Sequence, residues 1–256
     1  VVMVGDGVSG LSVGDKVAWK AAQGSYAEQV VVSAREAIRI PQLLDAETAA
    51  AVMLQGLTAH YLASSTYAVQ PGDTVLVHAA AGGVGQLLTQ IVKLRGGRVI
   101  ATVSTDRKES LAHSVGADEV VRYEHGDFAT TVRELTAGSG VAAVYDGVGA
   151  ATFEGSLASI RRRGTLVLYG AASGPVPPFD LQRLNPAGSL FVTRPTLGDY
   201  TATREELEER SDEILSWVAD GRLKVNIGGR YPLEEARSAH EDLEARRTTG
   251  KLLLRP

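Results

Sequence analysis

The central part of the sequence predicts an α/β fold built on a parallel, doubly wound sheet. From Gly72 onward, short apolar runs alternate with amphipathic helical patterns, and the connections between them are short. The first of these runs leads directly into a turn of small residues at 78–85. Strands that are separated by helices form parallel sheets buried on both faces, and such sheets bind ligands at the carboxyl ends of their strands.

Six runs are expected to be strands, and four patterns between them are expected to be helices. The strands are Thr74–His78, Arg98–Val103, Glu119–Val121, Val141–Tyr145, Thr165–Tyr169 and Leu190–Thr193. The helices are Gln86–Leu94, Arg107–Val115, Phe128–Leu135 and Phe153–Ile160. This order predicts a nucleotide-binding domain over residues 56–195.

The two flanks differ from this pattern and are expected to fold together as a split second domain, 1–55 and 196–256. Residues 1–41 contain short strands and turn signals, which indicates a β-rich portion, and a helix is expected at Ala49–Leu62. The C-terminal flank predicts a helix at Arg204–Ala219, capped at Thr203 with Glu206 three residues on. A turn at 228–229, a helix over 233–246 and a final strand over 250–254 are expected to follow.

Composition excludes several classes of protein. The 256 residues carry a formal net charge of −4, so there is no general attraction to nucleic acid or anionic membranes. The chain has no cysteine, which excludes disulfides and thiolate metal sites and favours a cytoplasmic enzyme. It also has no apolar run of about 18 residues, the length of a membrane span.

The turn after the first strand is typical of a Rossmann dinucleotide-binding unit. The G-x-G-x-x-G spacing falls on Ala80, Gly82 and Gly85, so alanine replaces the first glycine. Backbone amides at Gly82, Gly83, Val84 and Gly85 are expected to face a pyrophosphate at the start of the following helix. A tight turn that needs glycine only for packing is the alternative.

The end of the second strand favours NADPH over NADH. Enzymes that use NAD place an acid there to bind the ribose 2′-hydroxyl, but Ser104 occupies that position. Lys108, one helical turn on, can supply a positive charge to a 2′-phosphate. Asp106 weighs against this reading, and its expected role is an N-cap with Glu109 as partner.

Several segments, most of them outside the glycine turn, resemble the NADPH:quinone oxidoreductases (zeta-crystallin-like) of the medium-chain dehydrogenase/reductase superfamily. The resemblance covers essentially all 256 residues. The segments are Val13–Ala18, Gly56–Ala59, His78–Gly85, Val192–Pro195, Thr203–Leu207, Tyr231–Leu233 and Ala239–His240. The resemblance implies that the flanks form part of a GroES-like catalytic domain.

The resemblance also implies cofactor-binding residues. Lys108 and Tyr123 fall where relatives bind the 2′-phosphate, Thr58 approaches the nicotinamide and Tyr61 the phosphates or ribose. A hydroxyl bonded to its own helix is the alternative for Thr58. Adenosine and ribose contacts are expected at the ends of the fourth and fifth strands, and cofactor contacts further on: Val148, Tyr169, Gly170, Ala171, Arg194 and Arg246. A surface charge is the alternative for Arg246.

Relatives normally carry about seventy further residues before the segment that matches Val1, well beyond ordinary loop variation. The opening Val1–Val8 reads as the middle of a strand and has no initiator methionine. The Asn and Tyr residues that face nicotinamide and quinone in relatives belong to that earlier portion. Catalytic residues are therefore unassigned, and the sequence leaves open whether anything precedes Val1.

No zinc site is expected. Relatives that bind zinc hold a structural metal with four cysteines in a lobe that follows the segment resembling Gly14–Trp19. Here only Lys20–Gly24 separates that segment from Ser25–Glu28, and the chain has no cysteine. The histidines lack metal or triad spacing, and His78, at the end of a buried strand, is expected to be structural. An acceptor that takes hydride without a Lewis acid is favoured, such as a quinone or a conjugated enone.

The sequence therefore predicts an NADPH-dependent, zinc-independent quinone reductase. The alternatives are an enone or enoyl double-bond reductase, and a truncated NADPH-binding protein with little turnover. The physiological acceptor and the choice between one- and two-electron transfer stay open. The apolar run Leu190–Thr193 is expected to be an edge strand that pairs with its copy in a homodimer.

Overall fold

The computed structural model describes residues 1–123, 127–245 and 247–256. The chain divides into two compact units, and each is treated by itself. One unit is the continuous segment Ala59–Asp199, and the other combines Val1–Thr58 with Tyr200–Pro256.

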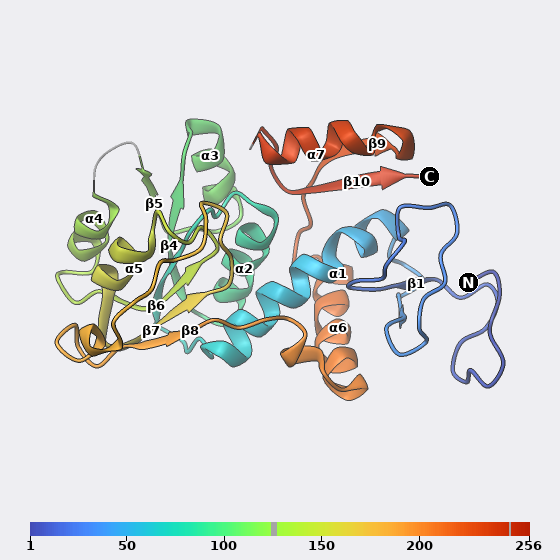
Figure 1. The fold of residues 1–256 in the computed structure, drawn as a ribbon, viewed down its shortest axis with the longest axis horizontal. Helices are drawn as coiled ribbons and strands as arrows, with labels where there is room; N and C mark the ends of the chain where they lie inside the picture. The colour runs from blue at the N-terminus through green and yellow to red at the C-terminus, as the bar shows by residue number, and fades with distance from the viewer. Residues whose placement is uncertain (124–126, 246) are drawn as a thin grey trace. The chain divides into compact units, whose positions relative to one another are not determined.

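The continuous unit is built on a six-stranded parallel sheet, which confirms the predicted fold class (Figure 1). The strand order is β5-β4-β3-β6-β7-β8. The strands are β3 (Thr74–Val77), β4 (Arg98–Val103), β5 (Glu119–Arg122), β6 (Val141–Asp146), β7 (Ile160–Leu168) and β8 (Phe191–Thr193). From β3 the chain moves outward to β5 and then returns to β6, so the strand order reverses beside β3. Ligands of doubly wound sheets bind at this reversal point.

Four helices cover the sheet, with α2 and α3 on one face and α4 and α5 on the other (Figure 1). They span Gly83–Leu94 (α2), Asp106–Ser114 (α3), Phe128–Leu135 (α4) and Phe153–Ser159 (α5). This placement follows from right-handed crossovers that run in opposite directions from β3. The apolar faces of α4 and α5 pack on the central strands, where Phe128, Val132 and Phe153 meet Leu76 and Val144.

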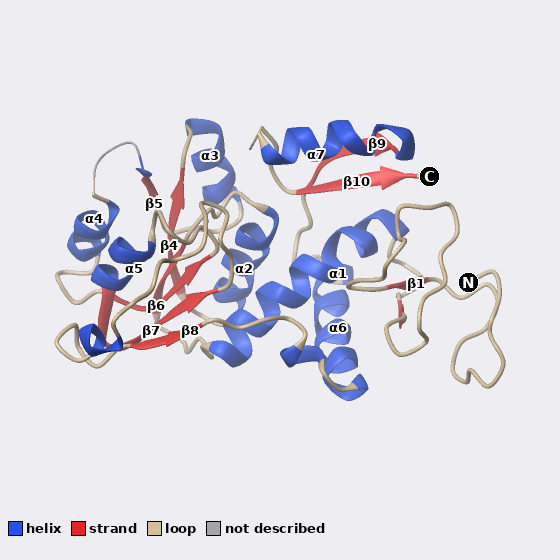
Figure 2. Ribbon diagram, in the orientation of Figure 1, coloured by secondary structure: helices blue, strands red, loops and turns tan. Residues whose placement is uncertain are grey.

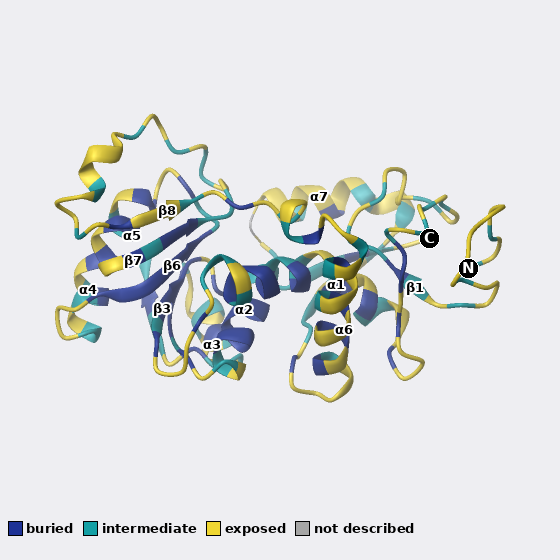
Figure 3. Ribbon diagram, turned by 90° about the horizontal axis from the view of Figure 1, so that it is seen from below, coloured by how far each residue is buried: buried dark blue, intermediate teal, exposed yellow. Residues whose placement is uncertain are grey.

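The central strands are buried on both faces, as the apolar runs predicted. Every residue of β6 is buried, and β3 and β6 are dark blue in Figure 3. β7 is longer than expected, because it begins at Ile160 and includes Arg163 in the left-handed conformation (φ 58°). β8 lies at the edge of the sheet, and Phe191 there is 61% exposed.

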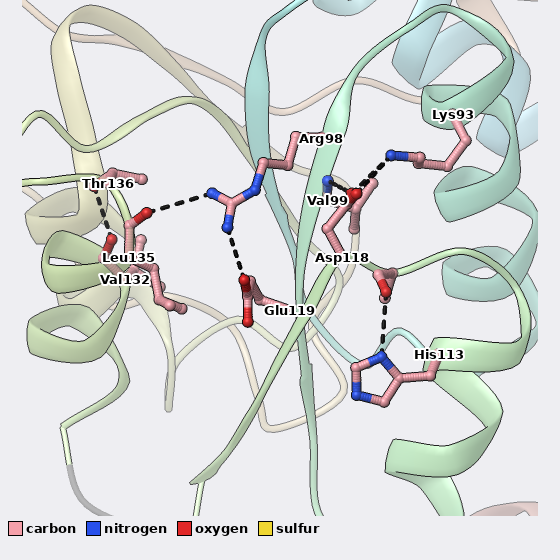
Figure 4. A network of polar contacts seen from close by, with 10 residues as sticks. Lys93, Arg98, Val99, His113, Asp118, Glu119, Val132, Leu135 and Thr136 are labelled. Carbon is pink, nitrogen blue, oxygen red and sulfur yellow. Dashed lines mark hydrogen bonds and ion pairs between the residues drawn. The ribbon is translucent and has the colours of Figure 1, made fainter.

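Polar contacts align β4 with β5 at the start of the two strands (Figure 4). The Asp118 carboxylate accepts from the Val99 amide (2.7 Å) and from Lys93 Nζ (2.8 Å). Arg98 Nη2 donates to Glu119 at 2.9 Å. These contacts set the parallel register that brings the far ends of β4 and β5 level with each other.

The other unit contains two small sheets, and loops cover much of residues 1–45 (Figure 2). Its strands are β1 (Val17–Ala18), β2 (Ile38–Arg39), β9 (Ile227–Pro232) and β10 (Lys251–Arg255). Its helices are α6 (Arg204–Ala219) and α7 (Ala236–Glu244), and α1 (Ala46–Tyr61) begins in it. Short helical turns lie at Asp199–Thr201 and Leu233–Glu235, and two more, at Leu62–Thr66 and Leu181–Leu184, belong to the continuous unit.

The predicted start of α6 is confirmed, whereas the turn predicted at 228–229 is wrong. Thr203 and Glu206 form a reciprocal capping box at the N-terminus of α6. Gly228 and Gly229 instead lie inside β9, which pairs with β10 in parallel. A side chain at Gly228 would collide with the Thr249 carbonyl, so glycine there permits close approach of two chain segments and not a reversal.

Within the described residues, no helix combines the length and the apolarity needed to cross a bilayer.

Candidate functional site

The turn between β3 and α2 ends in a helix start without a side-chain cap. Gly82 is the N-cap residue, and its own N–H donates to the Ala79 carbonyl at 2.9 Å. The amides of the first helical turn, at Gly83, Val84 and Gly85, lack carbonyl partners within the helix. Such a helix start favours a phosphate, because its amides and its dipole both attract negative charge.

Close packing within this turn accounts for one glycine and for the alanine at the first fingerprint position. A side chain at Gly85 would lie 2.5 Å from the Ala79 carbonyl oxygen and 2.7 Å from Ala80 Cα. The left-handed conformation of the turn falls on Ala79 (φ 50°), and Ala80 is buried with its amide bonded to the Thr102 carbonyl. A methyl group at Ala80 is therefore tolerated, while one at Gly85 is not.

We expect Gly85→Ala to lower the free energy of unfolding by about 1–3 kcal/mol, because the turn backbone must move to admit the methyl. Gly82→Ala is the matched control, since its added carbon would lie 3.2 Å from the same carbonyl and its φ of −75° suits alanine. Urea denaturation of both variants checks this. Equal losses in the two variants would contradict the packing argument.

The end of β4 places a lysine against a serine. Ser104 follows β4, and Lys108 lies in the first turn of α3. Lys108 Nζ donates to Ser104 Oγ at 3.2 Å, and both residues are partly exposed. An ammonium beside a hydroxyl, with no acid at the strand end, suits a phosphate better than a bare ribose hydroxyl.

The prediction that Asp106 caps α3 is wrong. The N-cap is Thr105, whose side chain accepts from the Lys108 amide. Asp106 forms an ion pair with Arg122, and Arg122 Nε lies 3.2 Å from Glu109 Oε2. Arg122 reaches both acids because it pairs in register with the last residue of β4. It thus neutralises the acids that weighed against a phosphate beside Lys108.

Tyr123 follows β5, and its hydroxyl lies against the side chains of Thr102 and His78. Thr102 Oγ1 donates to Tyr123 Oη at 2.6 Å, and His78 Nδ1 lies 3.0 Å from the same oxygen. His78 Nδ1 also lies 2.8 Å from Thr102 Oγ1. Burial raises the pKa of Tyr123 to about 12, so the phenol keeps its proton at neutral pH.

The other side of His78 leads to a buried carboxylate. His78 Nε2 lies 2.9 Å from Ser156 Oγ, which donates to Asp146 at 2.8 Å. Asp146 also accepts from the Thr152 hydroxyl at 2.7 Å. Burial lowers the pKa of His78 to about 4, although the Asp146 charge opposes this shift. The expectation that His78 is a hydrogen-bonded, buried residue is confirmed.

Asp146 also shapes the turn after β6. Its second carboxylate oxygen accepts from the amides of Val148 (2.8 Å) and Gly149 (3.0 Å). This turn packs against the one that follows β7, where a side chain at Gly170 would meet the Gly147 backbone. Four of the residues expected to contact the cofactor lie on these two turns: Val148, Tyr169, Gly170 and Ala171.

Four other predicted contacts stay predictions. The Thr58 hydroxyl donates to the Leu54 carbonyl at 2.7 Å, which matches the local alternative for that residue. Tyr61 is buried at 2% exposure. Arg194 is exposed directly after β8, and its guanidinium donates to the neighbouring carbonyl at 3.4 Å. Arg246 lies outside the described residues.

Sequence reasoning gave no role to Arg122 or Asp146. Asp146 has a recognisable signal, because it is the charged residue that ends the otherwise apolar run of β6. The partners of Asp146 lie within ten residues of it, on the following turn and at α5. Those of Arg122 lie on α3, so only the tertiary fold identifies them.

The donor set does not suit zinc. The sequence has no cysteine, and in the stretches 1–123, 127–245 and 247–256 no three His, Asp or Glu side chains gather as a metal site. The uncapped start of α2 and the Lys108–Ser104 pair do fit a phosphorylated dinucleotide.

Comparison with known proteins gives consistent matches. A family model described as "Zinc-binding dehydrogenase" matches residues 115–254. A quinone oxidoreductase of Pseudomonas aeruginosa is 45% identical over 100% of this chain and 79% of its own length. A 2-haloacrylate reductase of a Burkholderia species is 39% identical over 99% of this chain and 77% of its own.

A solved structure extends this likeness to the fold. The crystal structure of Escherichia coli quinone oxidoreductase complexed with NADPH has a TM-score of 0.97 and 43% identity, covering 100% of this chain and 79% of that one. Its likeness covers both flanks as well as the nucleotide-binding sheet. The chain belongs to the quinone oxidoreductase family of the medium-chain dehydrogenases and reductases.

Proposed function

We propose that this protein reduces quinones with NADPH. The observation that carries the proposal is the pairing of Lys108 with Ser104 at the end of β4, beside the uncapped start of α2. The Lys108–Ser104 pair suits a 2′-phosphate and the start of α2 suits a pyrophosphate. Both lie at the carboxyl ends of neighbouring strands. Relatives that are quinone oxidoreductases, one of them solved with NADPH, support the same function.

The residues of this chain bind and orient the cofactor. Amides at 83–85 bind the pyrophosphate, and Lys108 and Ser104 bind the 2′-phosphate. The turns after β6 and β7 position the riboses, with Val148 and Tyr169 among their residues. When bound, NADPH supplies the hydride that reduces the acceptor. The protein contributes positioning and exclusion of water, without a covalent intermediate.

Further parts of the proposal rest on the sequence and on the resemblance. Reduction proceeds without zinc and in the cytoplasm, and both flanks belong to a GroES-like domain. Thr58, Tyr61, Arg194 and Arg246 contact the cofactor. The absence of cysteine from the sequence supports reduction without zinc and a cytoplasmic location.

The function is tested by monitoring the oxidation of NADPH through its absorbance. One assay uses a small quinone as acceptor, and a parallel assay uses an α,β-unsaturated ketone. We expect saturable, quinone-dependent oxidation of NADPH and much slower oxidation of NADH. Faster turnover of the enone would favour the alternative of a double-bond reductase, which the 2-haloacrylate reductase among the relatives supports. Saturable NADPH binding without any acceptor-dependent oxidation would reduce the function to nucleotide binding.

We also propose a homodimer that pairs β8 with its copy over Leu190–Thr193. The support is an apolar edge strand on which Phe191 is 61% and Val192 36% exposed. We expect Phe191→Lys to convert the dimer to a monomer, because a charge at the sheet edge opposes strand pairing. Leu181→Lys is the control: it changes an exposed apolar residue outside β8 and should leave the protein dimeric. Light scattering measures both masses. A monomeric wild-type mass would refute the proposal.

A further inference from the structure

The Asp146–Ser156–His78 chain has only one arrangement of protons. Asp146 faces donors alone: two hydroxyls and two backbone amides. Ser156 gives its single proton to that carboxylate, so its oxygen can only accept from His78 Nε2. His78 is neutral, since burial lowers its pKa to about 4. The proton therefore sits on Nε2, and Nδ1 is an acceptor that needs a donor.

Two hydroxyls compete to be that donor. Tyr123 Oη lies 3.0 Å and Thr102 Oγ1 2.8 Å from His78 Nδ1, and the two oxygens are 2.6 Å apart. While the Thr102 hydroxyl donates its hydrogen bond to Tyr123 Oη, the Tyr123 hydroxyl donates its own to His78 Nδ1. The Tyr123 hydroxyl then has no proton left for a ligand. It can donate to a phosphate only when Thr102 takes over the bond to His78.

We propose that Thr102 is a specificity-determining positioning residue, which selects the phosphorylated cofactor by replacing Tyr123 as the donor to His78. The inference rests on the proposed NADPH function and deepens it. Without the exchange, a 2′-phosphate that engages Tyr123 would leave the buried His78 Nδ1 unsatisfied. A cofactor that lacks this phosphate makes no such demand, so Thr102 acts on NADPH and not on NADH.

Thr102→Val removes the hydroxyl while keeping the shape of the side chain. We expect its dissociation constant for NADPH, measured by calorimetry, to rise roughly tenfold, the usual consequence of one orphaned buried acceptor. The constant for NADH should stay within about twofold, because no phosphate engages Tyr123. Thr102→Ser keeps the hydroxyl and should restore NADPH binding. Equal weakening of both cofactors, or of neither, would overturn the inference.

The double variant Thr102→Val/Tyr123→Phe provides a second test. Tyr123→Phe already removes the donor to phosphate, so adding Thr102→Val should leave the NADPH-to-NADH affinity ratio unchanged. A further tenfold fall in that ratio would show that Thr102 acts independently of Tyr123, contrary to the inference.

Wild-type protein gives a readout that does not depend on any variant folding. Nitrogen-15 NMR of the histidine rings should show the Nε2–H tautomer for His78, both without and with NADPH. The Nδ1–H tautomer in either state would overturn the exchange. Wild-type protein that binds NADPH no more tightly than NADH would instead refute the proposed function, so the two failures are distinguishable.

Discussion

We expect replacement of Lys108 by methionine to raise the dissociation constant for NADPH roughly 30-fold and to leave that for NADH nearly unchanged. The magnitude follows from losing one charge-assisted hydrogen bond to the 2′-phosphate, about 2 kcal/mol. The lysine lies 3.2 Å from Ser104 at the end of β4, where an NAD enzyme would have an acid. Calorimetric titration with the two cofactors measures both constants.

Arg107→Met is the matched control for this variant. Arg107 precedes Lys108 on α3, is exposed, and carries the same charge. Adjacent helical residues point in different directions, so this change tests only the general electrostatic field. Equal weakening in both variants would mean that the net charge of α3, and not a contact of Lys108, favours NADPH. Raising the salt concentration should weaken NADPH binding to wild-type protein more than to Lys108→Met.

The second large effect is on stability at acid pH. In the unfolded protein His78 has a pKa near 6.5, whereas burial lowers this pKa to about 4 in the folded protein. The unfolded state therefore binds more protons between these values, and the free energy of unfolding falls as the pH drops from 7 to 4. The loss from this group amounts to about 3 kcal/mol, and it levels off below pH 4.

Comparison with His78→Gln isolates this contribution. Glutamine offers an N–H donor and an oxygen acceptor without titrating in this range. The pH dependence of the stability difference between the two proteins therefore reports the histidine. We expect urea denaturation to show the wild-type advantage shrinking by about 3 kcal/mol between pH 7 and pH 4. A difference that is constant with pH would contradict the neutral, buried state of His78.

Many helices and strands of both units could be read from the sequence because their signals are local. Apolar runs that are buried on both faces predicted the central strands, and Thr203 with Glu206 marked the start of α6. The same local reasoning misplaced the cap of α3, since Thr105 and Asp106 are both good capping residues and adjacent. It also read Gly228–Gly229 as a turn, although these glycines admit a close neighbour.

The sequence by itself determined the order of strands and helices, the small-residue turn before α2, and the serine and lysine after β4. Only the tertiary structure decided that Arg122 neutralises Asp106 and that Tyr123 shares its hydroxyl with Thr102 and His78. Periodicity and capping act over a few residues, whereas these partners lie on strands and helices that are far apart in the sequence. The parallel register brings them together, and no spacing along the chain encodes that register directly.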